Sequence, residues 1–307
     1  MRFGAHGAGA AVLMGLYTGW GGGGFPLIGD PGFWVSVVLV FLWITGLINA
    51  YNFMDGTDGI AGWQGLVAAG GWALLLERAG QPQGALFFGA LGAAALGFLC
   101  WNRPRASIFL GDAGSTFFGL LFAAAPLVAI AGGMPGDQAF GAAVLFVWPF
   151  IADTAQTLVW RAWRREPIFE AHRSHIYQRL AATFIGREQG HWVVGLLYGG
   201  LALLGLGLHF REGPFWGKLG VLAGVWVAVA GWTWLRETEQ AEAQTRSRAG
   251  DLDETPPASD KLMPSVEPPA HQPFRIPLCP PTVPERTDQL VALLQSGNVG
   301  PDRKSTR

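Results

Sequence analysis

Long apolar runs constrain this chain more than any other feature of its sequence. Most of them approach the roughly 20 residues that a helix needs to cross the hydrocarbon core of a bilayer. Within lipid, a helix satisfies its own backbone hydrogen bonds, which an open sheet cannot do. The sequence therefore predicts an all-α integral membrane protein with about eight transmembrane helices. The expected spans lie near 8–20, 33–49, 60–76, 84–101, 115–131, 139–160, 191–209 and 215–235.

The composition supports a membrane location and argues against some other classes. Only 14% of the 307 residues are charged, against roughly 25% in soluble domains. Glycine and tryptophan are abundant, as in membrane helices and their interfacial belts. Aromatic and apolar residues fall in long runs, which argues against a nucleic-acid-binding module. Cys100 and Cys279 lie far apart, so no disulfide framework or metal knuckle is expected.

The distribution of arginine predicts the orientation in the membrane. Six arginines lie in the 161–190 segment and two more in the 102–114 segment, whereas the loops on the opposite side carry few basic residues. Cytoplasmic loops of membrane proteins carry an excess of Lys and Arg. We therefore expect the N-terminus, these two segments, the 50–59 segment and the C-terminal region on the cytoplasmic side.

The character of the sequence changes after residue 235. Residues 236–307 are rich in charged and polar side chains and contain several prolines. Such a segment buries too little apolar surface to fold alone. We expect two regions: a polytopic transmembrane domain over 1–235, and a disordered, proline-rich cytoplasmic tail over 236–307 with a short helix near 287–295.

A first polar segment, residues 49–59, follows the second expected span. Asp55 and Asp58 each precede a glycine, so a tight turn can direct both carboxylates at one point. Ionisable groups at a membrane boundary are costly and usually functional. An alternative interpretation is that the two Asp-Gly pairs only form turns, with Asp58 capping the next helix.

A second polar segment, residues 102–116, lies between the fourth and fifth expected spans. Gly111, Asp112 and Ser115 open the fifth expected helix, and a glycine turn at a helix N-terminus presents backbone N–H groups to phosphate. Asp112 would offer oxygen ligands to Mg²⁺, which binds few carboxylates together with substrate phosphates. Alternatively, Asp112 and Ser115 only cap this helix.

A third segment, residues 170–179, lies in the long basic loop. If it is helical, His172, His175 and Arg179 share one face, where imidazole and guanidinium groups would suit a diphosphate. Two histidines at this spacing also suit a metal, and a plain basic loop would satisfy the charge bias of cytoplasmic loops. Asp153, inside the sixth expected span, is a supporting candidate because buried acids in spans are usually functional or paired.

Together, these segments predict a diphosphate site at the cytoplasmic membrane surface. They read Asn52-Phe-Met-Asp-Gly-Thr-Asp-Gly59, Phe109-Leu-Gly-Asp-Ala-Gly-Ser115 and His172-Arg-Ser-His-Ile-Tyr-Gln-Arg-Leu180. Their order and spacing resemble the signature motifs of the polyprenyl-phosphate N-acetylhexosamine-1-phosphate transferases of glycosyltransferase family 4. The third segment is nearer the branch that initiates O-antigen than phospho-muramoyl-pentapeptide transferase, a more distant relative. The resemblance covers about residues 1–200, with weaker support to 235.

This resemblance implies a Mg²⁺-dependent transferase, for which Mn²⁺ could replace Mg²⁺. Such an enzyme moves a sugar-1-phosphate from a UDP-sugar to polyprenyl phosphate and releases UMP. The expected partners are UDP-N-acetylhexosamine, polyprenyl phosphate and the lipid bilayer. The product would initiate a cell-envelope glycan, such as the O-antigen of lipopolysaccharide or a cell wall polymer. By the same analogy, we expect a multi-pass protein of the bacterial inner membrane, with its active site and C-terminal tail in the cytoplasm.

The resemblance also assigns roles to individual residues. The expected catalytic residues are Asp55, Asp58 and Asp112, with Asp112 and Asp55 as metal ligands. The nucleophile is an anionic phosphate, so cationic groups matter more than a strong base. The expected substrate-binding residues are Asn52, Asn102, Gly111, Ser115, His172, Arg173 and His175.

One feature departs from the family pattern. Family members carry an adjacent Asp-Asp pair in an earlier cytoplasmic loop and have ten or eleven spans, whereas this sequence contains no Asp-Asp dipeptide. We therefore expect a family member that lacks its first two or three spans, through a misassigned start or a natural truncation. A catalytically inactive remnant is the main alternative, because loss of a metal-site carboxylate can abolish catalysis. A transporter is a further alternative, although acids at helix ends and the lack of visible repeats favour it less.

Overall fold

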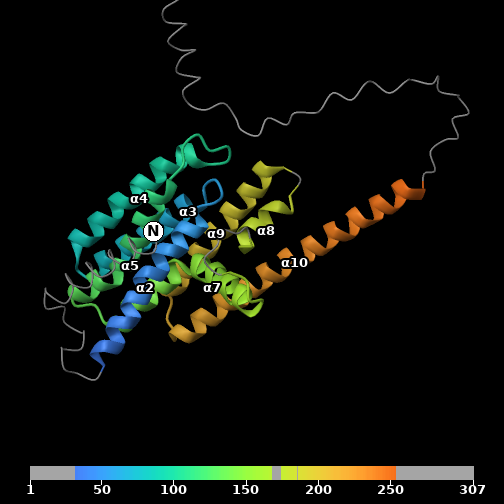
Figure 1. Cartoon of the computed structure of the whole chain (residues 1–307). Helices are drawn as coiled ribbons and strands as arrows, with labels where there is room; N and C mark the ends of the chain where they lie inside the picture. The colour runs from blue at the N-terminus through green and yellow to red at the C-terminus, as the bar shows by residue number, and fades with distance from the viewer. Residues whose placement is uncertain (1–31, 168–173, 185, 254–307) are drawn as a thin grey trace, which may run out of the picture. The chain divides into compact units, whose positions relative to one another are not determined.

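The computed structural model describes residues 32–167, 174–184 and 186–253 (Figure 1). Within these ranges the structure contains α-helices and no β-strands, which confirms the all-α fold expected from the apolar runs. The helices are α2 (Phe33–Met54), α3 (Ile60–Arg78), α4 (Pro82–Asn102), α5 (Gly111–Ala131), α6 (Gly136–Phe146), α7 (Trp148–Trp163), α8 (Ile176–Ala182), α9 (Arg187–His209) and α10 (Phe215–Asp253).

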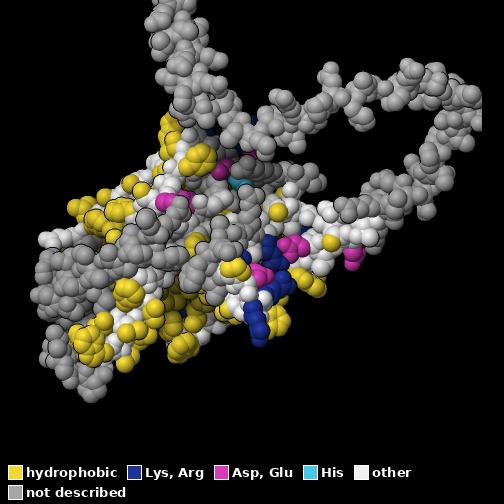
Figure 2. Space-filling view, viewed as in Figure 1, with side chains coloured by type: hydrophobic (Ala, Val, Ile, Leu, Met, Phe, Trp, Pro, Cys, Tyr) yellow, Lys and Arg dark blue, Asp and Glu magenta, His cyan; other side chains and the backbone are white. Residues whose placement is uncertain are grey.

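Five of the described helices, α2, α4, α5, α9 and α10, are long and apolar enough to cross a membrane, and the bent pair of α6 and α7 would make a sixth. Large apolar side chains such as Trp34, Leu86 and Leu196 are exposed on these helices, as expected where helices face lipid. Figure 2 shows yellow hydrophobic side chains over much of the coloured surface, with a group of dark-blue and magenta charged side chains right of centre. The fold is therefore that of an all-α membrane protein. The first expected span, 8–20, lies outside the described residues.

The third expected span, 60–76, forms α3 but is not among the five apolar helices. Its many glycine and alanine residues, together with Gln64, keep its mean hydropathy below that of these five helices. It contacts α4, α5, α6 and α9, and most of its residues are buried. Small residues allow close helix packing in membranes, and a helix enclosed by other helices needs little lipid-facing apolar surface. The described residues therefore account for five or six apolar spans, with α3 as an enclosed helix.

The sixth expected span, 139–160, is not one helix but two, α6 and α7, which meet at a bend of 75°. Pro149 has no backbone N–H and would clash with the carbonyl four residues earlier in a continuous helix. Val147, between the two helices, has non-helical dihedrals of φ −116° and ψ 18°. The buried side chain of Gln64 donates a hydrogen bond to the Phe146 carbonyl at 2.6 Å. The Phe146 carbonyl at the bend thus has a hydrogen-bond donor inside the bundle, as backbone groups within a bilayer require.

A close crossing sets the distance between α2 and α5, which carry the first two polar segments. A Cβ atom added at Gly119 of α5 would lie 2.7 Å from the Cα of Ile48 on α2, so only glycine fits without moving the helices. About one turn away along both helices, Asn52 of α2 contacts Ser115 of α5. The glycine at this crossing therefore determines how closely the polar helix ends approach.

The polar segments meet at one end of the helical bundle, which we call the site end. There α2 ends at Met54 and α3 begins at Ile60, while α4 ends at Asn102 and α5 begins at Gly111. The end of α7, the short helix α8 and the start of α9 join them. Side-chain hydrogen bonds link the segments across the bundle. Segments far apart in sequence are thus brought together where α2 and α5 reach the surface.

The last helix, α10, extends to Asp253 and so continues past residue 235, the expected end of the last span. Its C-terminal part projects from the other helices of the bundle (Figure 1). Residues 236–253 therefore form a helix rather than the disordered segment expected there, because Glu, Gln, Ala and Arg all favour helix. Residues 254–307 lie outside the described residues.

Candidate active site

Asn52, Asp112 and Ser115 form a hydrogen-bonded group at the site end. The Asn52 amide nitrogen donates to Asp112 Oδ1 and to Ser115 Oγ, both at 3.1 Å. The Ser115 hydroxyl donates to the Gly111 carbonyl at 3.1 Å. Asp112 is exposed in the first turn of α5, and no side chain caps this helix. A residue of α2 therefore orients the carboxylate of Asp112, and the choice between a binding and a capping role for Asp112 and Ser115 stays open.

Asp55 follows α2 directly and faces the same region. Burial, and to a smaller degree the negative charge of Asp112, raise the pKa of Asp55 to about 7. A carboxylate whose pKa is raised by a second carboxylate lies in a negative field, and such a field also attracts a cation. Asp55 and Asp112 therefore form an acidic pair at the site end.

This acidic pair fits a Mg²⁺ ion bound together with a diphosphate. Mg²⁺ is usually held by one or two carboxylates, with water and substrate phosphates completing its coordination. Within residues 32–167, 174–184 and 186–253, no three or more His, Cys, Asp or Glu side chains converge on one metal position. The pair would therefore suit an open site that shares its ion with substrate better than a closed structural metal site.

Asp58 belongs to a separate group at the same end. Its carboxylate accepts the Ala106 N–H at 3.3 Å and lies 3.1 Å from Nδ1 of His191, near the start of α9. Asp55 and Asp58 therefore have different neighbours, Asp112 and His191, and a common target for the two carboxylates stays a prediction. The printed contacts of the Asp58 carboxylate are with Ala106 and His191 rather than with the first N–H groups of α3, which does not favour the alternative capping role.

Asn102 joins the 55–59 turn to the loop before α5. It is buried, and its Oδ1 accepts the Gly59 N–H at 2.9 Å while its Nδ2 donates to the Ile108 carbonyl at 2.8 Å. These bonds hold the 55–59 turn against the loop before α5, which carries Asp58 toward that loop. Gly111 opens α5 with φ +67°, a left-handed conformation that glycine adopts readily. Direct contacts of Asn102 and Gly111 with substrate stay predictions.

Asp153 is fully buried in α7 and organises the third polar segment. Its carboxylate accepts the backbone N–H groups of Ile176 at 2.9 Å and Tyr177 at 3.0 Å, and the Tyr198 hydroxyl at 2.6 Å. Nδ1 of His175 lies 3.1 Å from the same carboxylate. An acceptor at the first N–H groups of a helix stabilises its start. Asp153 therefore fixes where α8 begins, which is the supporting role that its sequence position suggests.

The third segment consequently differs from the single helical face expected for it. His175 precedes α8 with extended backbone at φ −63° and ψ 144°, and its ring is buried. Arg179 lies in α8, and its Nε donates to Glu237 of α10 at 2.9 Å. The helix starts after His175 because Asp153 binds the N–H groups that follow. His172 and Arg173 lie outside the described residues.

A cavity of about 680 Å³ lies beside the 55–59 turn. Nδ1 of His191 and Oε1 of Gln178 are buried polar atoms without an aligned hydrogen-bond partner, and both residues line this cavity. Polar atoms in this state are favourable contacts for a polar ligand. The sequence patterns did not reveal His191, although an ionisable residue near the start of a span is a usable signal. The lining also includes Thr57, Arg179 and Glu237.

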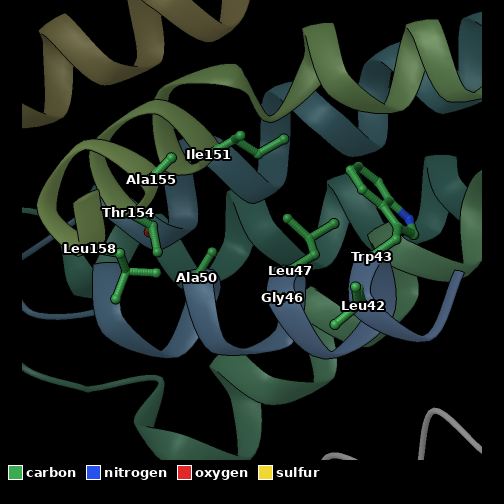
Figure 3. A pocket seen from close by; sticks show the side chains of 9 residues that line it. All are labelled: Leu42, Trp43, Gly46, Leu47, Ala50, Ile151, Thr154, Ala155 and Leu158. Atoms are coloured by element: carbon green, nitrogen blue, oxygen red, sulfur yellow. The ribbon is translucent and has the colours of Figure 1, made fainter. Parts of the chain in front are cut away.

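An apolar groove of about 220 Å³ runs between α2 and α7 (Figure 3). Its α2 side extends from Leu42 to Ala50, roughly 12 Å along the helix axis. Ala50 lies about one turn from Met54, where α2 reaches the site end. An alkyl chain in this groove would therefore have its polar head near the acidic pair. The other lining residues are Trp43, Gly46, Leu47, Ile151, Thr154, Ala155 and Leu158.

Comparison with known proteins shows which class has similar sequences. A sequence profile of glycosyl transferase family 4 matches residues 1–130. This region contains the first two polar segments, with Asp55, Asp58 and Asp112, and it ends before the third. The similarity therefore covers both members of the acidic pair and the residue that faces His191.

The individual relatives are phospho-N-acetylmuramoyl-pentapeptide-transferases. The protein from Shouchella clausii is 39% identical over 69 residues, which cover 22% of this chain and 21% of the relative. The Bacillus subtilis protein is 36% identical over 69 residues (22% and 21%), and the Lacticaseibacillus paracasei protein is 33% identical over 78 residues (25% and 24%). The chain thus matches about a fifth to a quarter of the length of these relatives. These similarities support the resemblance to glycosyltransferase family 4 and do not distinguish its O-antigen branch.

Proposed function

We propose that this protein transfers a sugar-1-phosphate from a UDP-sugar to polyprenyl phosphate. The observation that carries the proposal is the position of Asp55 and Asp112 near the end of an apolar groove. Such a place suits a reaction between a charged, soluble diphosphate and a phosphate whose lipid chain stays in the membrane. The similarity to phospho-N-acetylmuramoyl-pentapeptide-transferases supports this class of reaction.

In this reaction, an oxygen of the lipid phosphate forms a bond to the sugar-linked phosphorus of the UDP-sugar. The bond from that phosphorus to the bridging oxygen breaks, and UMP leaves with that oxygen. The attacking phosphate is already anionic near neutral pH, so no strong base is required. Repulsion between the anions and the charge on leaving UMP are the main obstacles, and positive charge reduces both.

Asp55 and Asp112 would hold Mg²⁺, or Mn²⁺ in its place. When bound, the cation supplies positive charge to the diphosphate and to the leaving group. Asn52 keeps the Asp112 carboxylate oriented through its hydrogen bond, so little reorganisation is needed when charge develops. The first turn of α5 offers further backbone N–H groups to phosphate.

The two substrates would occupy different parts of the site. The polyprenyl chain would lie in the apolar groove between α2 and α7, with its phosphate near the acidic pair. The sugar nucleotide would lie in the polar cavity beside Arg179 and His191. His172, Arg173 and His175 would contact the diphosphate, with His175 positioned by Asp153.

The motif resemblance favours a particular donor, product and location. The donor would be a UDP-N-acetylhexosamine, and the product would initiate O-antigen or another envelope glycan. The site end would face the cytoplasm of a bacterium at its inner membrane. Among the described residues, Arg103, Arg161 and Arg179 lie toward the site end, which supports that orientation through the charge bias of cytoplasmic loops.

A second candidate function is binding of the UDP-sugar without turnover. The sequence contains no Asp-Asp dipeptide, and in the described ranges the acidic pair has no third His, Cys, Asp or Glu ligand beside it. Fewer carboxylates would hold a cation less tightly. Such a protein would bind the donor and form no UMP.

Transfer of labelled sugar phosphate from UDP-N-acetylhexosamine to polyprenyl phosphate tests the proposal, in membranes that contain the full chain and Mg²⁺. Asp112→Asn keeps the side-chain size but removes its charge, and we expect transfer to fall on the order of 10²–10³-fold. Asp137→Asn is the matched control, because Asp137 also lies in the first turn of a helix but at the opposite end of the bundle. Equal losses in both variants would contradict the role of Asp112. No transfer from folded protein that binds the donor would favour the second candidate.

A further inference from the structure

His191 connects the polar cavity to Asp58, and it lies outside the three polar segments. It occupies the second turn of α9, next to Gly190. A Cβ atom added at Gly190 would lie 2.4 Å from the carbonyl oxygen of Ala181, so α9 packs here directly on the backbone of α8. This close packing fixes the rotation of α9 and places His191 against the 55–59 turn.

The contact between His191 and Asp58 is nearly buried but not fully aligned. Their side chains are 10% and 17% exposed, and 3.1 Å separates Nδ1 from Oδ2. The alignment falls short of a hydrogen bond, and contacts of this kind often tighten when substrate binds. The same oxygen accepts the Ala106 N–H at 3.3 Å. One oxygen of Asp58 is therefore held between α9 and the loop before α5.

The chemistry of the cavity wall indicates what kind of ligand would bind there. Oε1 of Gln178 is buried without an aligned partner, while its Nε2 donates to the Tyr177 hydroxyl at 3.1 Å. Arg179 and Glu237 add a cation and an anion to the same wall. An alkyl chain would leave the Gln178 oxygen unsatisfied and would lie against the Arg179–Glu237 ion pair. A nucleotide sugar, with many hydrogen-bonding groups, matches this polar wall.

We propose that His191 is a positioning residue for the sugar nucleotide. When the donor binds, Nδ1–H of His191 aligns with the carboxylate of Asp58 and donates to it, so that Asp58 and the cavity wall orient the donor for attack by the lipid phosphate. This inference rests on the proposed function and adds a residue that the motif resemblance does not assign. Because Asp58 and His191 lie apart from the acidic pair, loss of their contact should weaken donor binding more than the chemical step.

Two substitutions of His191 that both introduce a side-chain amide distinguish this positioning role from simple packing. In His191→Asn, the side-chain amide takes the place of Nδ1, whereas in His191→Gln it takes the place of Nε2 and leaves Asp58 without this donor. We expect the KM for the UDP-sugar to rise about 10- to 100-fold in His191→Gln and to stay within about threefold of wild type in His191→Asn. The KM for polyprenyl phosphate and kcat should change little. Gln189→Ala, at an exposed neighbour, serves as the control.

Binding of the UDP-sugar to the purified full chain, measured as a shift in unfolding temperature, gives a second readout that needs no turnover. If the wild type binds the donor but transfers nothing, the proposed transferase function fails, while the order of affinities expected for the two variants still tests His191. Equal donor affinity in His191→Asn and His191→Gln, or a loss confined to kcat, would overturn the positioning role. A wild-type chain that binds no UDP-sugar would overturn both proposals.

Discussion

The protonation state of Asp55 makes the candidate site sensitive to pH. Burial and the charge of Asp112 raise the pKa of Asp55 from an ordinary value of 3.8 to about 7. Between these two pH values the folded protein keeps a proton that the unfolded chain has lost. The free energy of unfolding of the cation-free protein therefore falls as pH rises through this window. A cation between Asp55 and Asp112 favours the ionised form and opposes this loss.

We predict that Mg²⁺ stabilises the protein more at high pH than at low pH. In detergent with EDTA, the unfolding temperature should fall as pH rises from about 5 to about 7. The increase produced by Mg²⁺ should be larger at about pH 8 than at about pH 6, because Asp55 must be ionised to bind the ion. Asp55→Asn should remove this dependence. An equal Mg²⁺ effect at both pH values in the wild type would contradict the assignment of Asp55 as a ligand.

Individual site residues could be predicted from the sequence, whereas their partners could not. Asp112 and Asp58 stand out because ionisable residues at the ends of long apolar runs are rare and costly. Their neighbours in space come from distant helices, since Asp58 faces His191 and Arg179 pairs with Glu237. Spacing along the chain indicates which face of a helix a residue occupies. It carries no direct information on which helix lies opposite.

Among the helices, the crossing of α2 and α5 has the most direct effect on the site. A Cβ atom at Gly119 would lie 2.7 Å from Cα of Ile48, whereas nothing lies within 4 Å of one added at Gly97 on α4. This difference makes the two positions a matched pair for substitution. Alanine normally stabilises a helix relative to glycine by roughly 0.5–1 kcal/mol. A loss of stability on substitution by alanine would therefore indicate a steric clash at the helix crossing.

We predict that Gly119→Ala lowers both stability and transfer, while Gly97→Ala leaves transfer unchanged. Separation of α2 from α5 would move Asn52 away from Asp112, and such displacement should reduce transfer on the order of 10- to 100-fold. Unfolding temperature in detergent and the transfer assay measure the two effects. If both alanine variants behave alike, the close crossing does not position the site.

The bend between α6 and α7 shows where sequence patterns stop being informative about helices. The length of the apolar run predicts a single span at 139–160, and Pro149 alone indicates a kink without giving its size. The bend of 75° also depends on Gln64, which binds the Phe146 carbonyl from another helix. Gly205 of α9 also contributes to the bend, because its lack of a side chain lets α9 pack closely there. A Cβ at Gly205 would lie 2.1 Å from the carbonyl oxygen of Leu145. These tertiary contacts override the local preference for a continuous helix.

Across the whole bundle, α10 joins the last span to the segment that carries the third motif. Glu237 binds Arg179, and Gln240 donates to the Thr183 carbonyl at 2.6 Å. These contacts explain why α10 continues beyond residue 235, where composition alone predicts a disordered tail. The beginning of the expected tail is thus part of the folded domain and packs on α8.

We predict that reversal of the Arg179–Glu237 pair restores stability lost in the single variants. Arg179→Glu and Glu237→Arg should each lower the unfolding temperature by placing like charges together, and the double variant should recover part of the loss. The coupling should be about 1 kcal/mol, since both side chains are about a third exposed. Glu239→Arg, at a more exposed position of the same helix, is the control. Additive losses in the double variant would show that the pair does not hold α10 against α8.

We propose that Asp55 and Asp112, near the end of the apolar groove, catalyse transfer between a nucleotide sugar and a lipid phosphate. UMP release by the purified full chain tests it most directly, with UDP-N-acetylhexosamine and polyprenyl phosphate as substrates. We predict that UMP forms only when both substrates and Mg²⁺ are present, in equal amount to the lipid-linked product, and that EDTA or Asp112→Asn removes it. Absence of UMP from folded protein that binds the UDP-sugar, or UMP formation without lipid phosphate, would contradict the claim.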